Sequence, residues 1–195
     1  MPPTSKLIRC SWVTDDQLVV RYHDKEWGVP VRNDRHLFGL IILEGAQAGL
    51  NWLTILRRRE AYREAFADFD AERIARFNER KITALLRDER IIRNRKKIES
   101  AVNNARAYLS LREQGETLSN FMWRFVDGTP VVNHWKEISQ IPAATPDSDA
   151  MSKAMKKAGF TFFGTTICYA HMQSAGMVND HLVSCFRHHD LTSAR

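Results

Sequence analysis

Two cysteine and histidine pairs lie at opposite ends of this chain, and together they constrain its fold more than any other feature. Cys10 and His23 are near the start. His181 and Cys185 are near the end. Thiolate and imidazole groups are preferred ligands of a four-coordinate structural zinc ion, which leaves no position open for water. A single site built from both pairs would hold the two ends of the chain together.

The spacing within the pairs supports this site only in part. His181 and Cys185 are four residues apart, which puts both side chains on one face of a helical turn. Cys10 and His23 are further apart, at a spacing that favours no particular geometry. From spacing alone, His23 has the alternative of a polar surface residue and Cys185 that of a small buried hydrophobic residue.

Composition indicates the class of protein. The chain has 195 residues, of which 44% are hydrophobic, enough for one domain or a closely joined pair with a real core. Its three cysteines, and a start that is not a charged segment followed by an apolar run, indicate a reducing cytoplasm without a disulfide framework. No uncharged apolar stretch approaches the roughly 18 residues of a membrane span. We therefore expect a soluble cytoplasmic protein that is not associated with a membrane.

The charge distribution favours a polyanionic partner. The formal net charge is +6, and several basic clusters stand next to predicted helix starts, where backbone N–H groups and the helix dipole also attract phosphate. For any single cluster the alternative is a solvated helix face. The clusters are Arg57 to Arg59, the group Arg87, Arg90, Arg93, Arg95, Lys96 and Lys97, and the group Lys153, Lys156 and Lys157.

The hydrophobic pattern predicts an all-α fold. Asp34 can cap a helix to about Gly45 that is too apolar for the surface, and Asp70 can cap another. Gly115 and Gly159 are suited to end two later helices. Only Pro130 to Asn133 resembles a strand. The predicted helices are 34–45, 48–66, 70–77, 82–87, 93–112, 118–126, 148–158 and 163–175.

A short helix, a tight turn and a long helix with a basic start describe Ile82 to Arg112, an arrangement that can lay backbone amides against DNA phosphate. Three further blocks make the pattern specific, and they are residues 12–30, residues 44–52 (EGAQAGLNW) and residues 164–181. With these blocks in the same order and spacing, the chain closely resembles the 3-methyladenine DNA glycosylase I family from Cys10 to about Cys185. That family is a zinc-containing member of the helix-hairpin-helix glycosylase superfamily.

The resemblance implies a two-lobed, all-α helix-hairpin-helix glycosylase fold. Residues 1–195 would form a single catalytic unit, with the helix-hairpin-helix lobe at about 70–165 and a second lobe from both termini. The family positions for zinc correspond to Cys10, His23, His181 and Cys185, which implies one structural zinc ion per chain. Cys168 is interpreted as a packing residue. The implied partner is double-stranded DNA containing an alkylated purine, bound by a monomer.

The resemblance also implies roles in the base pocket. Glu44 would be the catalytic carboxylate, which accepts hydrogen bonds from the base and favours the positively charged 3-methyladenine nucleotide over neutral adenine. Trp12 and Trp52 would stack on the cationic ring, and Tyr22 would contact the base edge. From the residues alone, the alternatives are core packing for the tryptophans and a helix-end glutamate held by backbone amides for Glu44.

The resemblance also implies residues that contact DNA. Leu50 matches the position of a wedge that fills the gap left when a nucleotide turns out of the duplex. Its alternative from sequence alone is a core leucine. Gln47 and Gly49 are also predicted to contact DNA. Ala46 stands beside Gln47 where the family often has two glutamines, and Val19 stands where some members have tyrosine. Phosphate contacts are predicted for Arg93, Arg95, Lys96 and Lys97.

The predicted reaction is hydrolysis of the N-glycosidic bond by a monofunctional glycosylase, as part of base excision repair. The family lacks the catalytic aspartate of other branches, and the alkylated base departs as a neutral molecule, so protonating it adds little. Arg90 and Lys96 replace small residues of the family hairpin, which puts the hairpin contacts with DNA in doubt. The remaining alternative is a zinc-stabilised protein that binds damaged DNA without catalysis.

Overall fold

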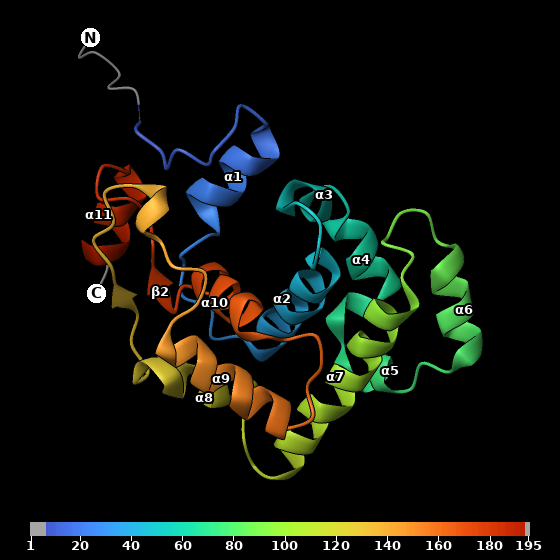
Figure 1. The fold of residues 1–195 in the computed structure, drawn as a ribbon. Coiled ribbons are helices and arrows are strands. Elements are labelled where there is room, and N and C mark those ends of the chain that lie inside the picture. The colour runs from blue at the N-terminus through green and yellow to red at the C-terminus, as the bar shows by residue number, and fades with distance from the viewer. Residues whose placement is uncertain (1–6, 194–195) are drawn as a thin grey trace.

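A computed structural model describes residues 7–193, and it is predominantly helical (Figure 1). Two strands of two residues each complete the regular structure of this part of the chain. The elements are α1 Gln17–Lys25, α2 Asp34–Gln47, α3 Trp52–Leu56, α4 Arg59–Ala65, η1 Ala67–Phe69, α5 Ala71–Ala75, α6 Glu79–Arg87, α7 Arg95–Glu113, α8 Leu118–Trp123, η2 Arg124–Val126, β1 Val131–Val132, η3 Ile138–Gln140, α9 Pro146–Lys157, α10 Thr165–Ser174, β2 Val178–Asn179 and α11 Phe186–Ser193.

Helix α2 is the centre of the molecule, as its apolar sequence predicts. It packs against α3, α4, α7, α8 and α10, and Figure 1 shows it enclosed by these helices. Leu37, Phe38 and Ile41 are fully buried. A helix that is apolar on all sides must be covered on all sides, and α2 carries Glu44 and Ala46 of its last turn into the protein interior.

The predicted cap of α2 was wrong by one residue. Asn33 is the N-cap, and its side chain accepts a hydrogen bond from the His36 N–H. The Asp34 carboxylate instead accepts from the N–H groups of Leu118 and Ser119 at the start of α8. The first turn of α2 is therefore tied to a distant helix, a contact that no local pattern indicates.

The predicted helix over residues 48–66 was also wrong, because the structure divides it into α3 and α4. Gly49 takes a left-handed backbone conformation with φ +78°, which ends the path of α2. Asn51 then starts α3 by accepting a hydrogen bond from the Thr54 N–H at 2.9 Å. Residues 48–51 form an exposed turn between α2 and α3.

Other predicted boundaries were closer. Asp70 caps α5, and Gly115 and Gly159 follow the ends of α7 and α9 with positive φ, as predicted. The helix predicted over 118–126 ends as an α-helix at Trp123 and continues as the 3-10 turn η2. Helices α1 and α11 were not predicted. Among residues 7–193, none of the helices combines the length and the hydropathy of a membrane-spanning segment.

The buried apolar residues form two clusters. The larger core lies among α2 to α10. The smaller core, which we call the terminal core, consists of Cys10, Tyr22, Trp27, Leu56, Leu182 and Cys185. The parallel pairing of β1 with β2 joins the segment after α8 to the C-terminal part of the chain. Trp52 and Ile141 pack against both cores, so they mark the boundary between them.

Candidate active site and metal centre

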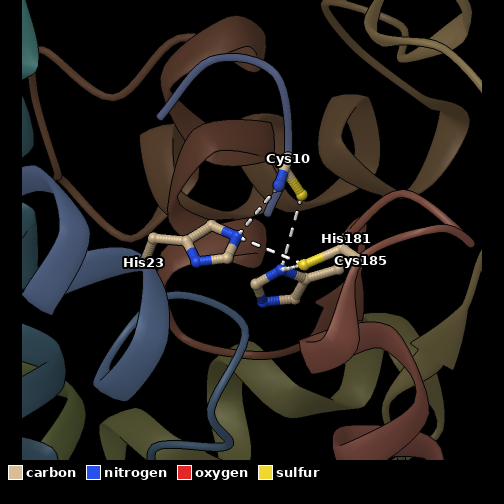
Figure 2. A group of neighbouring side chains, drawn as sticks. All are labelled: Cys10, His23, His181 and Cys185. Carbon is tan, nitrogen blue, oxygen red and sulfur yellow. Dashed lines mark hydrogen bonds between the residues drawn. The ribbon is translucent and has the colours of Figure 1, made fainter. Parts of the chain in front are cut away.

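The four predicted metal ligands meet in the terminal core. Cys10, His23, His181 and Cys185 are all buried, and one ligand atom from each lies within 4.8 Å of the others. Figure 2 shows the two sulfurs and the two imidazole rings facing a common centre, although they come from opposite ends of the chain. The tertiary fold therefore builds a site in which a metal ion can bind.

The separations between these atoms match a tetrahedral site. The Cys185 sulfur lies 3.4 Å from His23 Nε2 and 3.6 Å from His181 Nδ1. The Cys10 sulfur also lies 3.6 Å from His181 Nδ1. Metal–sulfur and metal–nitrogen bonds of about 2.3 and 2.0 Å at tetrahedral angles place sulfur and nitrogen about 3.5 Å apart. These three sulfur–nitrogen separations are those expected of a tetrahedral metal site.

The second nitrogen of each histidine ring fixes the direction in which the ring faces. His23 Nδ1 lies 2.8 Å from Asp24 Oδ1, and His181 Nε2 lies 3.1 Å from the carbonyl oxygen of Trp27. Each ring donates to this oxygen and turns the lone pair of its other nitrogen toward the sulfurs. Arg9 donates to Asp24 at 2.7 Å and holds that carboxylate in place.

The two thiols are also linked. The pKa of Cys185 is lowered, chiefly because the Cys10 thiol donates a hydrogen bond to it and also because of its contacts with His181 and His23. The pKa of Cys10 is raised by the same hydrogen bond and by burial. The cluster therefore favours a thiolate at Cys185, which is the form in which cysteine binds a metal.

A pocket of about 420 Å³ lies at the boundary between the two cores. Its walls come from α1, α2, α3 and α10, and from the segment around residues 138–143. Among the described residues that line it, Glu44 is the only acidic side chain, and there is no lysine or arginine. The aromatic lining residues are Trp12, Tyr22, Trp27, Trp52 and Tyr169. This is a largely apolar cavity with one carboxylate, a combination suited to a planar cation.

Glu44 lies in the last turn of α2, and its side chain is 3% exposed. Both carboxylate oxygens accept hydrogen bonds from side chains of α10. The Ser174 hydroxyl donates to Oε1 at 2.5 Å, and His171 Nδ1 lies 2.8 Å from Oε2. Side chains of a distant helix, not backbone amides, therefore hold this carboxylate at the pocket. Sequence reasoning missed both partners, although His171 and Ser174 lie within the block at 164–181.

The three residues predicted to bind a base all lie on the pocket wall. The Tyr22 and Trp52 rings are tilted against each other with centroids 5.5 Å apart. Trp12 packs edge-on against Trp27 at 5.1 Å and against the ligand His23 at 5.3 Å. The pocket wall and the metal cluster therefore share side-chain contacts.

The environment of Tyr22 keeps its hydroxyl protonated. Its pKa is raised well above the usual value, first by burial and then by the negative charge of Glu44. The Trp52 indole N–H opposes that rise slightly, but it does not reach hydrogen-bond geometry with any acceptor in the described residues. Tyr22 can therefore donate a hydrogen bond into the pocket, and the Trp52 N–H is unused.

Asp180 lies behind the pocket wall, and sequence reasoning did not single it out. It is 1% exposed, and four side chains donate to its carboxylate. Asn133 and Trp135 donate to Oδ1 at 2.7 and 2.8 Å. Tyr169 and Gln173, which line the pocket, donate to Oδ2 at 2.6 and 2.8 Å. Its position directly before the ligand His181 was the available signal. Asp180 fixes one wall of the pocket.

The residues predicted at the DNA gap occupy the turn after α2. Leu50 is 40% exposed, which places it among the exposed large apolar side chains of the described residues. It is therefore not a core leucine. Gln47 lines the pocket, and Gly49 has an open surrounding with no atom within 4 Å of an added Cβ. Lys97 was predicted to contact phosphate, and its ammonium donates to the carbonyl oxygens of Ala46 and Ala48.

The basic residues around the turn from α6 to α7 differ in their partners. Arg93 pairs with Glu89, and Arg95 pairs with Glu79 and Glu99. Lys96 is exposed and has no ion pair in the described part of the chain. These three residues lie at or just before the first turn of α7, whose N-cap Asn94 accepts from the Lys97 N–H.

Arg90, which stands where the family often has glycine, lies in the same turn. Its guanidinium pairs with Asp88 and Glu64. Within residues 7–193 it is not among the positions with positive φ. The turn therefore needs no glycine at this position, and the substitution does not strain the backbone.

Known proteins resemble the chain over nearly its whole length. Residues 12–188 match the methyladenine glycosylase family. DNA-3-methyladenine glycosylase 1 of Escherichia coli (strain K12) is 50% identical over 177 residues, which are 91% of this chain and 95% of that protein. A crystal structure of 3-methyladenine DNA glycosylase I matches with a TM-score of 0.91 at 50% identity, covering 92% of this chain and 98% of the other. A structure of 3-methyladenine DNA glycosylase I from Staphylococcus aureus, which concerns 3-methyladenine recognition, matches with a TM-score of 0.88 at 35% identity, covering 91% and 95%.

Proposed function

This chain belongs to the methyladenine glycosylase family, and on that premise we propose that it excises 3-methyladenine from alkylated double-stranded DNA by hydrolysing the bond between base and sugar. The observation that carries the proposal is the buried Glu44 carboxylate at an aromatic pocket with no other charged lining residue in the described chain. A solved relative bears the description of a complex with 3-methyladenine. The pocket of this chain has the charge and the flat walls that such a base requires.

Glu44 is the proposed catalytic carboxylate. A 3-methyladenine nucleotide carries a positive charge on its base, and a carboxylate in a pocket with little water attracts that charge more strongly than it would in bulk water. Neutral adenine lacks this attraction. Trp12 and Trp52 supply aromatic faces for the cationic ring, and Tyr22 supplies a hydroxyl for its edge. Glu44 therefore selects the alkylated base and orients it for departure.

The reaction needs one water and no covalent intermediate. The bond between the base nitrogen and C1′ of the sugar breaks, and its electron pair neutralises the cationic base. Water adds to C1′ and loses a proton, which leaves an abasic sugar and free 3-methyladenine. No lysine lines the described pocket, so no amine is available there to form a Schiff base with the sugar. We therefore infer a monofunctional glycosylase, which acts in base excision repair.

The target nucleotide has to leave the duplex to reach this pocket. Leu50 is the proposed wedge, because it is an exposed apolar side chain on the turn next to the pocket. Apolar side chains inserted between bases partly replace lost stacking. Gly49 would let the DNA backbone come close, and Gln47, which lines the pocket, is the proposed contact beside the gap.

The turn between α6 and α7 is the proposed helix-hairpin-helix element. α7 has 19 residues and begins with a capped turn, whose N–H groups and dipole attract phosphate. Lys96 and Arg95 lie on this turn, and Arg93 lies just before it. Lys96 is the strongest candidate for a phosphate contact, because its charge is unpaired within residues 7–193.

Zinc is the proposed metal of the Cys10, His23, His181 and Cys185 cluster, with one ion per chain. Two sulfurs and two imidazole nitrogens at tetrahedral separations are a donor set that zinc prefers. Four protein ligands leave no place for an activated water, so the ion has a structural role. The ligand His23 directly follows Tyr22, so the metal also holds the wall of the base pocket.

We keep the proposed architecture of one catalytic unit with two lobes, of which the helix-hairpin-helix lobe covers about residues 70–165. The pocket at the boundary between the two cores supports it. A monomer suffices, because one chain supplies every proposed pocket and metal residue.

Release of free 3-methyladenine from methylated duplex DNA tests the function. Glu44→Gln should lower the single-turnover rate by about a hundredfold or more, since removal of one preorganised electrostatic contact typically has that effect. Glu60, a glutamate on α4 whose side chain is 75% exposed, provides the matched control Glu60→Gln, which should behave as the wild type. Metal content and thermal unfolding must be equal in all three proteins. Tight binding of damaged DNA without base release would instead indicate a damage-binding protein.

A further inference from the structure

His171 on α10 forms a hydrogen bond to Glu44 through one ring nitrogen, and its other ring nitrogen has no hydrogen-bond partner among the described residues. His171 is completely buried, and its Nδ1 lies 2.8 Å from Glu44 Oε2. Its Nε2 is buried and has no hydrogen-bond partner in the described part of the chain. The Phe163 ring packs edge-on against the imidazole, with centroids 5.4 Å apart.

This asymmetry distinguishes the protonation states of the ring. An imidazolium has two N–H donors, and here the one at Nε2 would be buried without an acceptor. Such an orphaned donor is costly, more so when it is charged. Attraction to Glu44 favours the imidazolium. The desolvation cost of burying a charged ring opposes this gain. A neutral ring with its proton on Nδ1 makes the bond to Glu44 and leaves only a lone pair unpaired.

Ser174 provides a second neutral donor. It lies three residues after His171, on the same face of α10, and its hydroxyl donates to Oε1 of Glu44 at 2.5 Å. The same hydroxyl is 3.1 Å from the carbonyl oxygen of His171. The Ser174 hydroxyl has only one hydrogen, which it donates to Glu44 Oε1 because that contact is the shorter one. Each oxygen of Glu44 therefore has one donor, and neither donor brings a positive charge.

We propose that His171 is a neutral Nδ1–H donor that, together with Ser174, positions Glu44 and leaves its full negative charge available to the base. The proposal rests on the proposed function, in which Glu44 faces a cationic base. An imidazolium would fix the carboxylate equally well in space but would cancel its charge. The pocket would then lose its preference for a cationic base over neutral adenine. His171 is a positioning residue, because it acts through Glu44.

Nitrogen NMR of the wild-type, metal-loaded protein tests the protonation state directly. With ¹⁵N-labelled histidine, the His171 ring at neutral pH should show one protonated nitrogen, Nδ1, and one bare nitrogen, Nε2. His171→Asn identifies the signals by their loss. Two protonated nitrogens, or a proton on Nε2 alone, would overturn the proposal. This readout does not depend on activity, so it stands even if no base release is detected.

Two substitutions test the consequence for the reaction. His171→Leu removes the donor and should lower the single-turnover release of 3-methyladenine by about tenfold to a hundredfold, the range for losing a hydrogen bond to a buried charged group. His171→Asn keeps an N–H near the position of Nδ1 and should recover most of that loss. Metal content and thermal unfolding must match those of the wild type.

The direction of the His171→Asn effect separates the two states. If His171 is an imidazolium, asparagine removes a positive charge beside a cationic substrate, and KM should fall below the wild-type value. A lower KM or a faster release in His171→Asn than in the wild type would therefore refute the neutral donor. If His171→Leu unfolds, the NMR result and the KM of His171→Asn still decide the question. Absence of release by the wild type, with a neutral His171 ring, would refute the proposed function alone.

Discussion

At the scale of single residues, two glycines share a backbone conformation but differ in their surroundings. Gly115 has φ +80° and Gly176 has φ +66°. An added Cβ at Gly115 would meet nothing within 4 Å, whereas at Gly176 it would lie 2.3 Å from the carbonyl carbon of Val29 and 2.5 Å from the nitrogen of Pro30. Backbone atoms cannot rotate away as a side chain can. Gly115 is needed for its conformation only, and Gly176 also for the close packing of α10 against the segment before α2.

Alanine substitutions should separate these two requirements. Gly115→Ala should lower the free energy of unfolding by about 1 kcal/mol, the cost of a left-handed conformation for a residue with a Cβ. Gly176→Ala should lower it by about 3 kcal/mol or more, because the backbone at Val29 must also shift. Urea unfolding of both variants measures the difference. Equal losses would show that the segment at Val29 moves aside freely.

At the scale of elements, the first turn of α7 holds the last turn of α2. The Lys97 ammonium donates to the carbonyl oxygens of Ala46 and Ala48 at 2.8 and 2.6 Å. The last carbonyl groups of a helix lack partners within the helix and attract a cation. Burial lowers the pKa of Lys97, as expected for an ammonium group that has left water. This lysine therefore supports the turn that carries Leu50.

Neighbouring lysines on α7 should then have different roles. Lys96→Met should weaken DNA binding and reduce the slope of log affinity against log salt by about 1, as the loss of one phosphate contact does. Lys97→Met should change that slope less, but it should slow base release from DNA that is already bound, because the turn with Leu50 loosens. Salt titrations and single-turnover assays measure the two effects. An equal change of slope in both variants would show that Lys97 contacts phosphate directly, as the sequence predicts.

At the scale of the whole molecule, the cluster of Cys10, His23, His181 and Cys185, at which we propose a metal, joins the ends of the chain to the pocket. Cys10 and Cys185 belong to the terminal core together with Tyr22 and Trp27, and both aromatic residues also line the pocket. Loss of the metal should therefore affect both the stability of the protein and the shape of the base pocket.

Cysteine substitutions provide a matched test of this coupling. Cys185→Ser should abolish stoichiometric metal binding and lower the free energy of unfolding by about 3 kcal/mol or more, since metal binding contributes directly to folding. Base release should fall with it. Cys168 is equally buried but lies outside the cluster, so Cys168→Ala should keep the metal and most of the activity. Metal analysis and chemical unfolding give the readout, and full metal occupancy in Cys185→Ser would contradict the ligand assignment.

Local features of the fold could be predicted from the sequence because they depend on neighbours along the chain. The continuous apolar run of α2 indicates a buried helix. The cap at Asp70 and the helix-ending glycines at 115 and 159 act through hydrogen bonds and φ angles within a few residues. The break at Gly49 was missed because the apolar residues on both sides continue a helical spacing, and only the cap at Asn51 marks the new start.

The sequence by itself determined the helical class and the family, and it predicted the residues of the proposed metal site and of the base pocket. Tertiary structure alone decided which distant groups meet. Glu44 finds its donors His171 and Ser174 at separations of 127 and 130 residues, and Lys97 turns to the end of α2. Asp180 gathers four donors from two segments. Such contacts follow from how helices pack and which polar groups that packing buries, and a buried polar group must bond to whatever the fold brings near.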